Sequence, residues 1–166
     1  MWFLSQSPEI TRCRAAQLGA ACDADGACLA LMGALGAGKT AFVQGLAIGL
    51  GLDARSVASP TFVIASEYPL VDGRRLAHVD FYRIRDEEEL ELAGFTDLAQ
   101  RGTVLAVEWA DRLPRALPAD RLELRLAREG SETRRLEASA RGGASEALLA
   151  RWREALVGSG VALECR

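Results

Sequence analysis

The sequence predicts an α/β fold in which a mixed central sheet is flanked by helices in three layers. Three features lead to this prediction. An uninterrupted apolar run at 27–32 is typical of a buried parallel strand, a glycine-rich segment follows at 33–40, and a helical pattern continues from residue 41. Because the segment GALGAGKT fits the phosphate-binding pattern G-x-x-x-x-G-K-[ST] at every fixed position, a P-loop NTPase-like architecture is expected.

Length and composition favour one soluble domain over residues 1–166. The chain is 49% hydrophobic and 26% charged, and no apolar run approaches a membrane-spanning length. The apolar N-terminal residues have no basic flank, so we expect a cytoplasmic protein without a membrane partner. A net charge of −3 argues against broad binding to a nucleic-acid backbone, so any link to RNA is expected to be indirect.

The first half of the chain predicts a strand and two helices around the glycine-rich segment. A short strand is expected at 2–4, and Ser7 is expected to cap a helix over 8–21, which opens on a proline. The helix that begins after the glycine-rich segment should continue to about Leu50, where glycines end it.

Two further strands are predicted over 62–68 and 75–82, joined by a turn at 71–73. They form an antiparallel hairpin, which makes the sheet mixed. Asp86 is expected to cap a short acidic helix over 87–93, whose carboxylates we interpret as a solvated face rather than a metal site.

The C-terminal part predicts three strands and a helix. The run at 104–108 is apolar and ends on a carboxylate, while 122–126 and 134–138 alternate with a period of two residues. Ser145 is expected to cap a final helix, whose apolar stripe packs on the core and ends before Gly158.

The glycine-rich segment predicts a nucleotide site. Glycines let backbone N–H groups approach phosphate oxygens, and the following helix adds the positive end of its dipole. Lys39 is the only lysine beside nineteen arginines, and it is expected to reach the β- and γ-phosphates, where the wide fork of an arginine would not fit. The Thr40 hydroxyl is placed to ligate Mg²⁺. The expected nucleotide contacts are Gly33, Leu35, Gly36, Ala37, Gly38, Lys39, Thr40 and Ala41.

Carboxylates at strand ends are the candidates for holding the metal and orienting water. Asp80 and Glu108 each close an apolar strand, although either could be an ordinary surface carboxylate. Thr61 lies in a proline-constrained loop and could sense the γ-phosphate, or it could belong to an ordinary turn.

Three other residue types carry less information. Trp109 follows Glu108 and is expected on the opposite side of the strand, where core packing and a nucleotide or partner contact are both open. We interpret His78 as a packed, hydrogen-bonded histidine rather than a general base. The four cysteines lack zinc-type spacing and are expected to be free thiols, mostly buried.

Four motifs together resemble one known family. The segments GALGAGKT (33–40), SPTF (59–62), HVDFYR (78–83) and VEW (107–109), in this order and spacing, are similar to those of the TsaE (YjeE) family. The resemblance implies a small bacterial P-loop ATPase with weak intrinsic turnover. Such proteins act with TsaB and TsaD in forming threonylcarbamoyladenosine beside the anticodon of tRNAs, so the resemblance implies ATP and Mg²⁺ as cofactors and TsaB- and TsaD-like partners.

The resemblance also implies roles for individual residues. Lys39 and Thr40 would hold the triphosphate and Mg²⁺, and Asp80 would be a second metal-linked carboxylate. Glu108 would orient or activate water beside the metal, and Thr61 would be the switch threonine.

Trp109 matches a signature position beside the nucleotide. The chain departs from the usual family pattern at Ala34, where an acidic residue is common, and at Ala110, where proline is common. Neither change removes a phosphate ligand.

Two alternative functions remain open from the sequence. A P-loop small-molecule kinase would need an arginine-rich lid, and the only adjacent basic pair late in the chain is at 134–135, inside a predicted strand. The second alternative is a nucleotide-dependent binding switch in which hydrolysis is incidental. It differs from an ATPase only in how much the hydrolysis contributes to function. A GTPase is disfavoured, because the chain has no N-K-x-D segment to recognise guanine.

Overall fold

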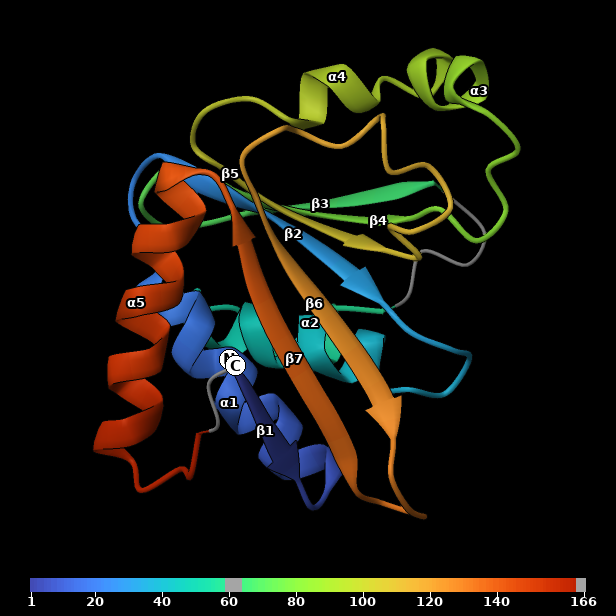
Figure 1. Ribbon diagram of the computed structural model, residues 1–166. Helices are drawn as coiled ribbons and strands as arrows, with labels where there is room; N and C mark the ends of the chain where they lie inside the picture. Colours follow the sequence, from blue (N-terminus) through green and yellow to red (C-terminus); the bar gives the residue numbers. More distant parts are fainter. Residues whose placement is uncertain (59–63, 164–166) are drawn as a thin grey trace.

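The computed structural model describes residues 1–58 and 64–163 (Figure 1). In these residues one sheet of seven strands has the spatial order β1-β7-β6-β2-β5-β4-β3. Its strands are β1 (Trp2–Ser5), β2 (Gly26–Met32), β3 (Ala65–Pro69), β4 (Arg75–Asp80), β5 (Thr103–Glu108), β6 (Arg121–Arg128) and β7 (Arg134–Arg141). The helices are α1 (Pro8–Ala21), α2 (Lys39–Gly49), α3 (Glu87–Leu92), α4 (Phe95–Leu98) and α5 (Gly143–Gly158), with a 3₁₀ turn η1 (Ala54–Ser56).

The predicted mixed α/β sheet is confirmed. Strands β6, β2, β5 and β4 run parallel in the centre, while β7 pairs antiparallel with both β6 and β1, and β3 pairs antiparallel with β4. Parallel strands end at the same edge of a sheet. The carboxyl ends of β2, β5 and β4 therefore lie together, which sets the position of the functional site.

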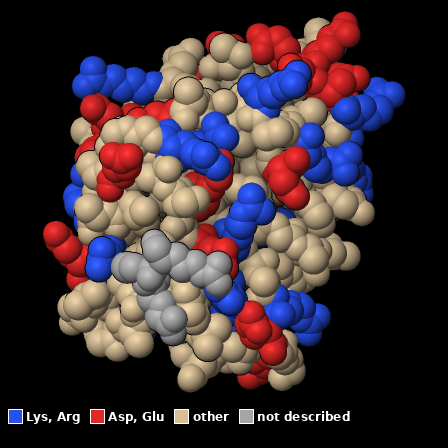
Figure 2. Space-filling view, viewed as in Figure 1, with Lys and Arg blue, Asp and Glu red and all other residues tan. Residues whose placement is uncertain are grey.

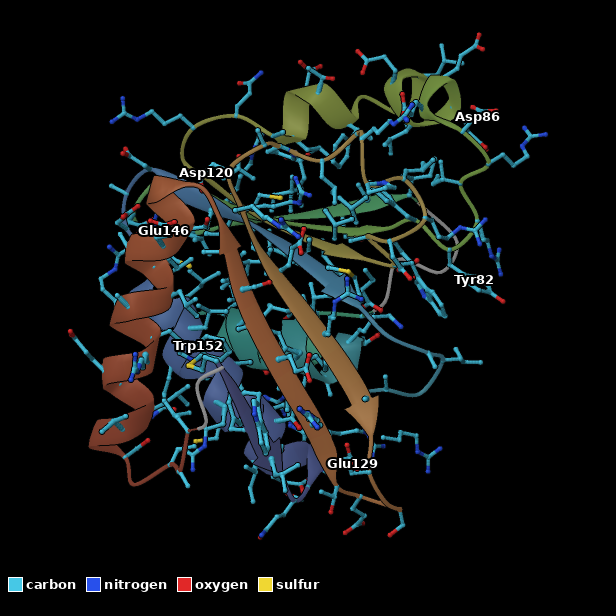
Figure 3. All side chains as sticks on the ribbon, in the orientation of Figure 1. Tyr82, Asp86, Asp120, Glu129, Glu146 and Trp152 are labelled. Atoms are coloured by element: carbon cyan, nitrogen blue, oxygen red, sulfur yellow. The ribbon has the colours of Figure 1, made fainter. Side chains whose placement is uncertain are left out.

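Helices cover both faces of the sheet. In Figure 1, α1, α2 and α5 lie on one side of it and the short helices α3 and α4 on the other. The first face carries a core in which Trp152 of α5 packs edge-to-face against Phe3 and Phe42, with ring centroids 5.8 and 6.1 Å apart (Figure 3). The second face carries a separate apolar cluster around Phe81 and Phe95. The layers match the predicted three-layer arrangement.

Local capping explains where the first helix begins. The Ser7 hydroxyl accepts a hydrogen bond from the Ile10 N–H at 3.3 Å, and Pro8 takes the first helical position, where no N–H is needed. Asp86 caps α3 in the same way, by accepting from the Glu89 N–H at 2.9 Å. Both caps are confirmed.

The prediction that Ser145 caps the last helix is wrong. Helix α5 begins at Gly143, and Ser145 lies in its first turn. The Asp120 carboxylate, from the segment before β6, accepts hydrogen bonds from the N–H groups of Ala144 and Ser145 at 2.9 Å each (Figure 3). The cap is therefore supplied by tertiary contact, which local sequence does not encode.

The expected hairpin is present with different limits. Its first strand begins at Ala65, and the expected start over 62–63 lies outside the described residues. A short helix, α4, was not expected from the sequence. Across the described ranges, no helix combines the length and apolar character needed to cross a lipid bilayer.

Candidate nucleotide-binding site

The P-loop, residues 33–40, follows β2 directly, and its last two residues, Lys39 and Thr40, begin α2. Two strand ends lie beside it: Leu31 of β2 is in register with Glu108 of β5, and Glu108 is in register with Asp80 of β4. The parallel central sheet thus brings both predicted carboxylates to the edge that carries the loop.

The backbone of the P-loop requires glycine at particular positions. Gly33 has φ 144° and Gly38 has φ 104°, both in the left-handed region that other residues avoid. A Cβ atom at Gly33 would also collide with the carbonyl oxygen of Leu126. The loop can therefore hold its N–H groups around an anion, as expected of a phosphate cradle.

The Lys39 ammonium is folded beneath the loop. Its Nζ donates to the carbonyl oxygens of Gly33 at 2.7 Å and Ala34 at 3.1 Å, and it lies 3.7 Å from the centroid of the Trp109 ring. Burial lowers the Lys39 pKa, while the nearby charges of Glu108, Asp80 and Asp111 oppose that shift. A partly desolvated cation of this kind favours an incoming polyphosphate.

Glu108 receives two hydrogen bonds on one oxygen. The Thr40 hydroxyl donates to Oε1 at 2.8 Å, and Nε2 of His78 lies 2.9 Å from the same oxygen. Glu108 is buried, so this carboxylate is not the surface carboxylate that the sequence left as an alternative. Its link to Thr40 joins the end of β5 to the first turn of α2.

Asp80 is half-buried at the end of β4. Its Oδ1 accepts from the Tyr82 N–H at 2.8 Å, and burial raises the Asp80 pKa, with Glu108 adding to that shift and the Tyr82 N–H opposing it. Asp80 and Glu108 therefore present neighbouring negative charges that a cation would stabilise.

Trp109 does not simply alternate away from Glu108. Its φ of 57° is left-handed, and β5 ends at the residue before it. The Trp109 ring lies against the Lys39 ammonium and also packs against the second apolar cluster. Tyr82, which projects beyond β4 on the side away from α5 (Figure 3), lies with its ring centroid 4.9 Å from that of Trp109. Trp109 therefore packs against the core and also lines the pocket, while a contact with nucleotide or a partner stays a prediction.

Most of the predicted site residues line one pocket of about 420 Å³. These are Leu35, Gly36, Gly38, Lys39, Thr40, Ala41, Asp80, Glu108 and Trp109, together with Tyr82 and Arg83. Gly33 and Ala37 line an adjoining cavity of about 710 Å³ on the β6–β7 side of the loop. Thr61 lies outside the described residues.

Sequence reasoning missed Arg134 as a site residue. It stands at the start of β7, and its Nη2 donates to the carbonyl oxygen of Gly36 at 3.3 Å. A guanidinium thus borders the loop on the side opposite Glu108. The basic pair at 134–135 was visible in the sequence, but its distance from the loop along the chain gave no reason to place it there.

The departure at Ala110 has a structural consequence. The Ala110 N–H donates to the carbonyl oxygen of Leu31 at 3.2 Å, joining the end of β5 to β2. A proline has no N–H and could not make this bond.

Residues at the site fit Mg²⁺ bound together with a nucleotide rather than alone. Within residues 1–58 and 64–163, no three His, Cys, Asp or Glu side chains are grouped closely enough to hold a metal ion. Mg²⁺ commonly binds through a few protein oxygens, with phosphates and water completing its shell. The Thr40 hydroxyl and the nearby carboxylates of Asp80 and Glu108 suit that arrangement.

Comparison with known proteins decides the family. Residues 5–136 match the family described as "Threonylcarbamoyl adenosine biosynthesis protein TsaE". The chain belongs to the TsaE family. The predicted resemblance is therefore confirmed.

Sequence and structural similarity to individual proteins supports the assignment of this chain to the TsaE family. The tRNA threonylcarbamoyladenosine biosynthesis protein TsaE of Bacillus subtilis is 42% identical over 143 residues, which cover 86% of this chain and 87% of the relative. The Streptomyces coelicolor protein of the same name is 45% identical over 108 residues, covering 62% and 70% of the two chains. A crystal structure of Bacillus YdiB superposes with a TM-score of 0.70 and 34% identity, covering 93% of this chain and 94% of YdiB.

Proposed function

We propose that this TsaE family member is a Mg²⁺-dependent ATPase that supports threonylcarbamoyl transfer to tRNA. The observation that carries the proposal is the convergence of Lys39, Thr40 and Glu108 at one pocket under the P-loop. The names of its relatives, which refer to tRNA threonylcarbamoyladenosine biosynthesis, support the pathway.

The P-loop residues would bind the triphosphate. Backbone N–H groups of residues 33–40 would surround the phosphates, and Lys39 would exchange its two carbonyl partners for phosphate oxygens. Thr40 would hold Mg²⁺ through its hydroxyl, with Asp80 and Glu108 at its side. When bound, the metal would neutralise charge on the phosphates.

The site would also promote hydrolysis of the bound ATP. Glu108 is fixed by hydrogen bonds beside Thr40, so it can orient a water molecule toward the γ-phosphate. We assign Thr61 the role of a switch residue that reports the γ-phosphate to partners, on the strength of the family motif in which it stands.

We further propose that the chain acts through TsaB- and TsaD-like partners in the cytoplasm and reaches tRNA only through that complex. The surface charge supports an indirect contact. Figure 2 shows basic and acidic side chains interspersed on the face that carries β6 and β7, and the net charge of the chain is −3. A uniform positive patch, as unaided RNA binding requires, is not visible on that face.

One experiment tests the ATPase proposal. Release of phosphate from ATP is measured with the purified chain alone, and again with TsaB- and TsaD-like partners and tRNA, each with and without Mg²⁺. We expect slow hydrolysis that requires Mg²⁺ and rises when the partners are added. Lys39→Ala should lose ATP binding, whereas Arg153→Ala, an exposed change on α5, should behave as the wild type.

Two results would contradict the proposal. Absence of ATP binding to the wild type would remove the ATPase role altogether. Transfer of labelled phosphate to a small molecule instead of water would favour the kinase alternative.

A further inference from the structure

His78 lies under the site without being part of its pocket. It is fully buried in β4, on the same face of the sheet as Glu108, and its register partner on β5 is Ala106. The small Ala106 side chain leaves room for the imidazole to reach diagonally to Glu108, two residues further along β5. This places Nε2 at 2.9 Å from Glu108 Oε1.

The hydrogen-bond partners indicate which imidazole nitrogen carries the hydrogen. A carboxylate oxygen only accepts, so Nε2 must donate to Glu108. Nδ1 is buried and has no hydrogen-bond partner among the described residues. A hydrogen on Nδ1 would therefore be a buried donor without a partner among the described residues, which is unfavourable. The arrangement fits a hydrogen on Nε2.

This hydrogen bond restricts the conformations of the Glu108 side chain. An unrestrained glutamate side chain samples several rotamers, and ordering it costs conformational entropy. His78 has few torsions and is packed in the sheet, so its donor is rigidly placed. Together with the Thr40 hydroxyl, it holds one carboxylate oxygen from two directions.

We propose that His78 is a positioning residue that fixes the Glu108 carboxylate for turnover by donating from Nε2. This inference rests on the proposed ATPase function for its catalytic consequence. The hydrogen bond itself is a property of the free chain and is tested without nucleotide.

The first test is spectroscopic and uses the fact that His78 is the only histidine. Long-range ¹H–¹⁵N NMR of the folded chain at neutral pH gives a single imidazole pattern that needs no assignment. We expect a protonated, pyrrole-type Nε2 and a bare, pyridine-type Nδ1, and in Glu108→Ala we expect this preference to relax. A bare Nε2, as in the Nδ1–H tautomer, would overturn the proposal.

The second test compares substitutions that differ in where they place a donor. In His78→Gln the side-chain amide nitrogen can place an N–H near the position of Nε2. In His78→Asn the amide nitrogen lies near the position of Nδ1, so its N–H does not reach Glu108. His78→Leu removes the donor altogether. We expect Asn and Leu to lower kcat about ten- to a hundredfold, with KM for ATP changed by less than about threefold, and Gln to restore most of the loss.

Thermal unfolding of each variant separates positioning from packing. If Gln, Asn and Leu lower kcat equally among variants that remain folded, His78 serves only the core and the inference is wrong. If the wild type itself hydrolyses no ATP, the proposed function fails and the positioning role fails with it, while the NMR result still decides whether the Nε2 bond exists.

Discussion

The Lys39 ammonium lies 3.7 Å from the centroid of the Trp109 ring, in direct contact with its face. On the proposed function, the phosphate chain of ATP would draw this ammonium away from the Gly33 and Ala34 carbonyls, so the surroundings of the indole would change. We predict that ATP alters tryptophan emission, and that Trp109→Phe abolishes the change.

Trp2→Phe is the matched control for this prediction. Trp2 lies on β1 under the Arg135 guanidinium, away from the P-loop pocket, so its replacement should leave the ATP-dependent signal intact. A signal that survived in Trp109→Phe would show that the emission change arises at another tryptophan, which would contradict the prediction.

Glu108→Gln should separate binding from turnover. The amide preserves side-chain size but has no negative charge with which to orient water. We expect hydrolysis to fall by about a hundredfold or more in single-turnover assays, while ATP affinity stays within about threefold of wild type. Glu154→Gln, an exposed change on α5, is the control. Unchanged hydrolysis in Glu108→Gln would remove Glu108 from the chemistry.

Arg134→Ala should weaken ATP binding modestly. The guanidinium borders the loop through its bond to the Gly36 carbonyl and adds positive charge beside the phosphates. Loss of one hydrogen bond and this charge predicts a three- to tenfold rise in Kd, about the magnitude usual for one bond. Arg153→Ala, an exposed change on α5, is the control in the same calorimetric titration. Equal effects of the two changes would mean that Arg134 contributes only general charge.

The burial of two thiols predicts that the free energy of unfolding falls at alkaline pH. Burial raises the pKa of Cys22 and of Cys28 from the ordinary value of 9.0 to about 12. Below pH 9 the thiols are neutral in both states and have no effect. Between about pH 9 and 12 only the unfolded chain ionises them, so the free energy of unfolding falls as pH rises, by at most about 1.4 kcal/mol per pH unit for each thiol.

Denaturant unfolding at several pH values checks this prediction. The double variant Cys22→Ala, Cys28→Ala should lose stability less steeply above pH 9 than the wild type, even if it is less stable at pH 7. Cys13→Ala, at an exposed position, should keep the wild-type slope. An equal slope in the double variant would mean that other groups cause the alkaline loss.

Local sequence patterns predicted most helices and strands, because the interactions that form a helix cap or a loop span only a few residues. The Ser7 cap joins positions three apart, and the glycine-rich loop follows its strand directly, so both could be recognised in the linear chain. Their place at the end of apolar runs marked Asp80 and Glu108 as candidates, although nothing local showed that the two strands are neighbours.

Contacts between distant segments could not be inferred in this way. The last helix is capped by Asp120, which lies on the far side of two strands in the sequence, so the local candidate Ser145 was wrong. Arg134 reaches the P-loop from 98 positions away. Such contacts depend on strand order and register, which the alternation of apolar residues within one strand does not specify.

The sequence by itself determined the strand–loop–helix unit, its Lys39 and Thr40, and the family to which the chain belongs, because short motifs and their spacing along the chain carry this information. Only the tertiary structure decided that Thr40, Glu108 and His78 meet at one carboxylate oxygen. The physical reason is that this meeting point exists only when β5 lies parallel between β2 and β4. The whole core stabilises that arrangement, rather than any one segment.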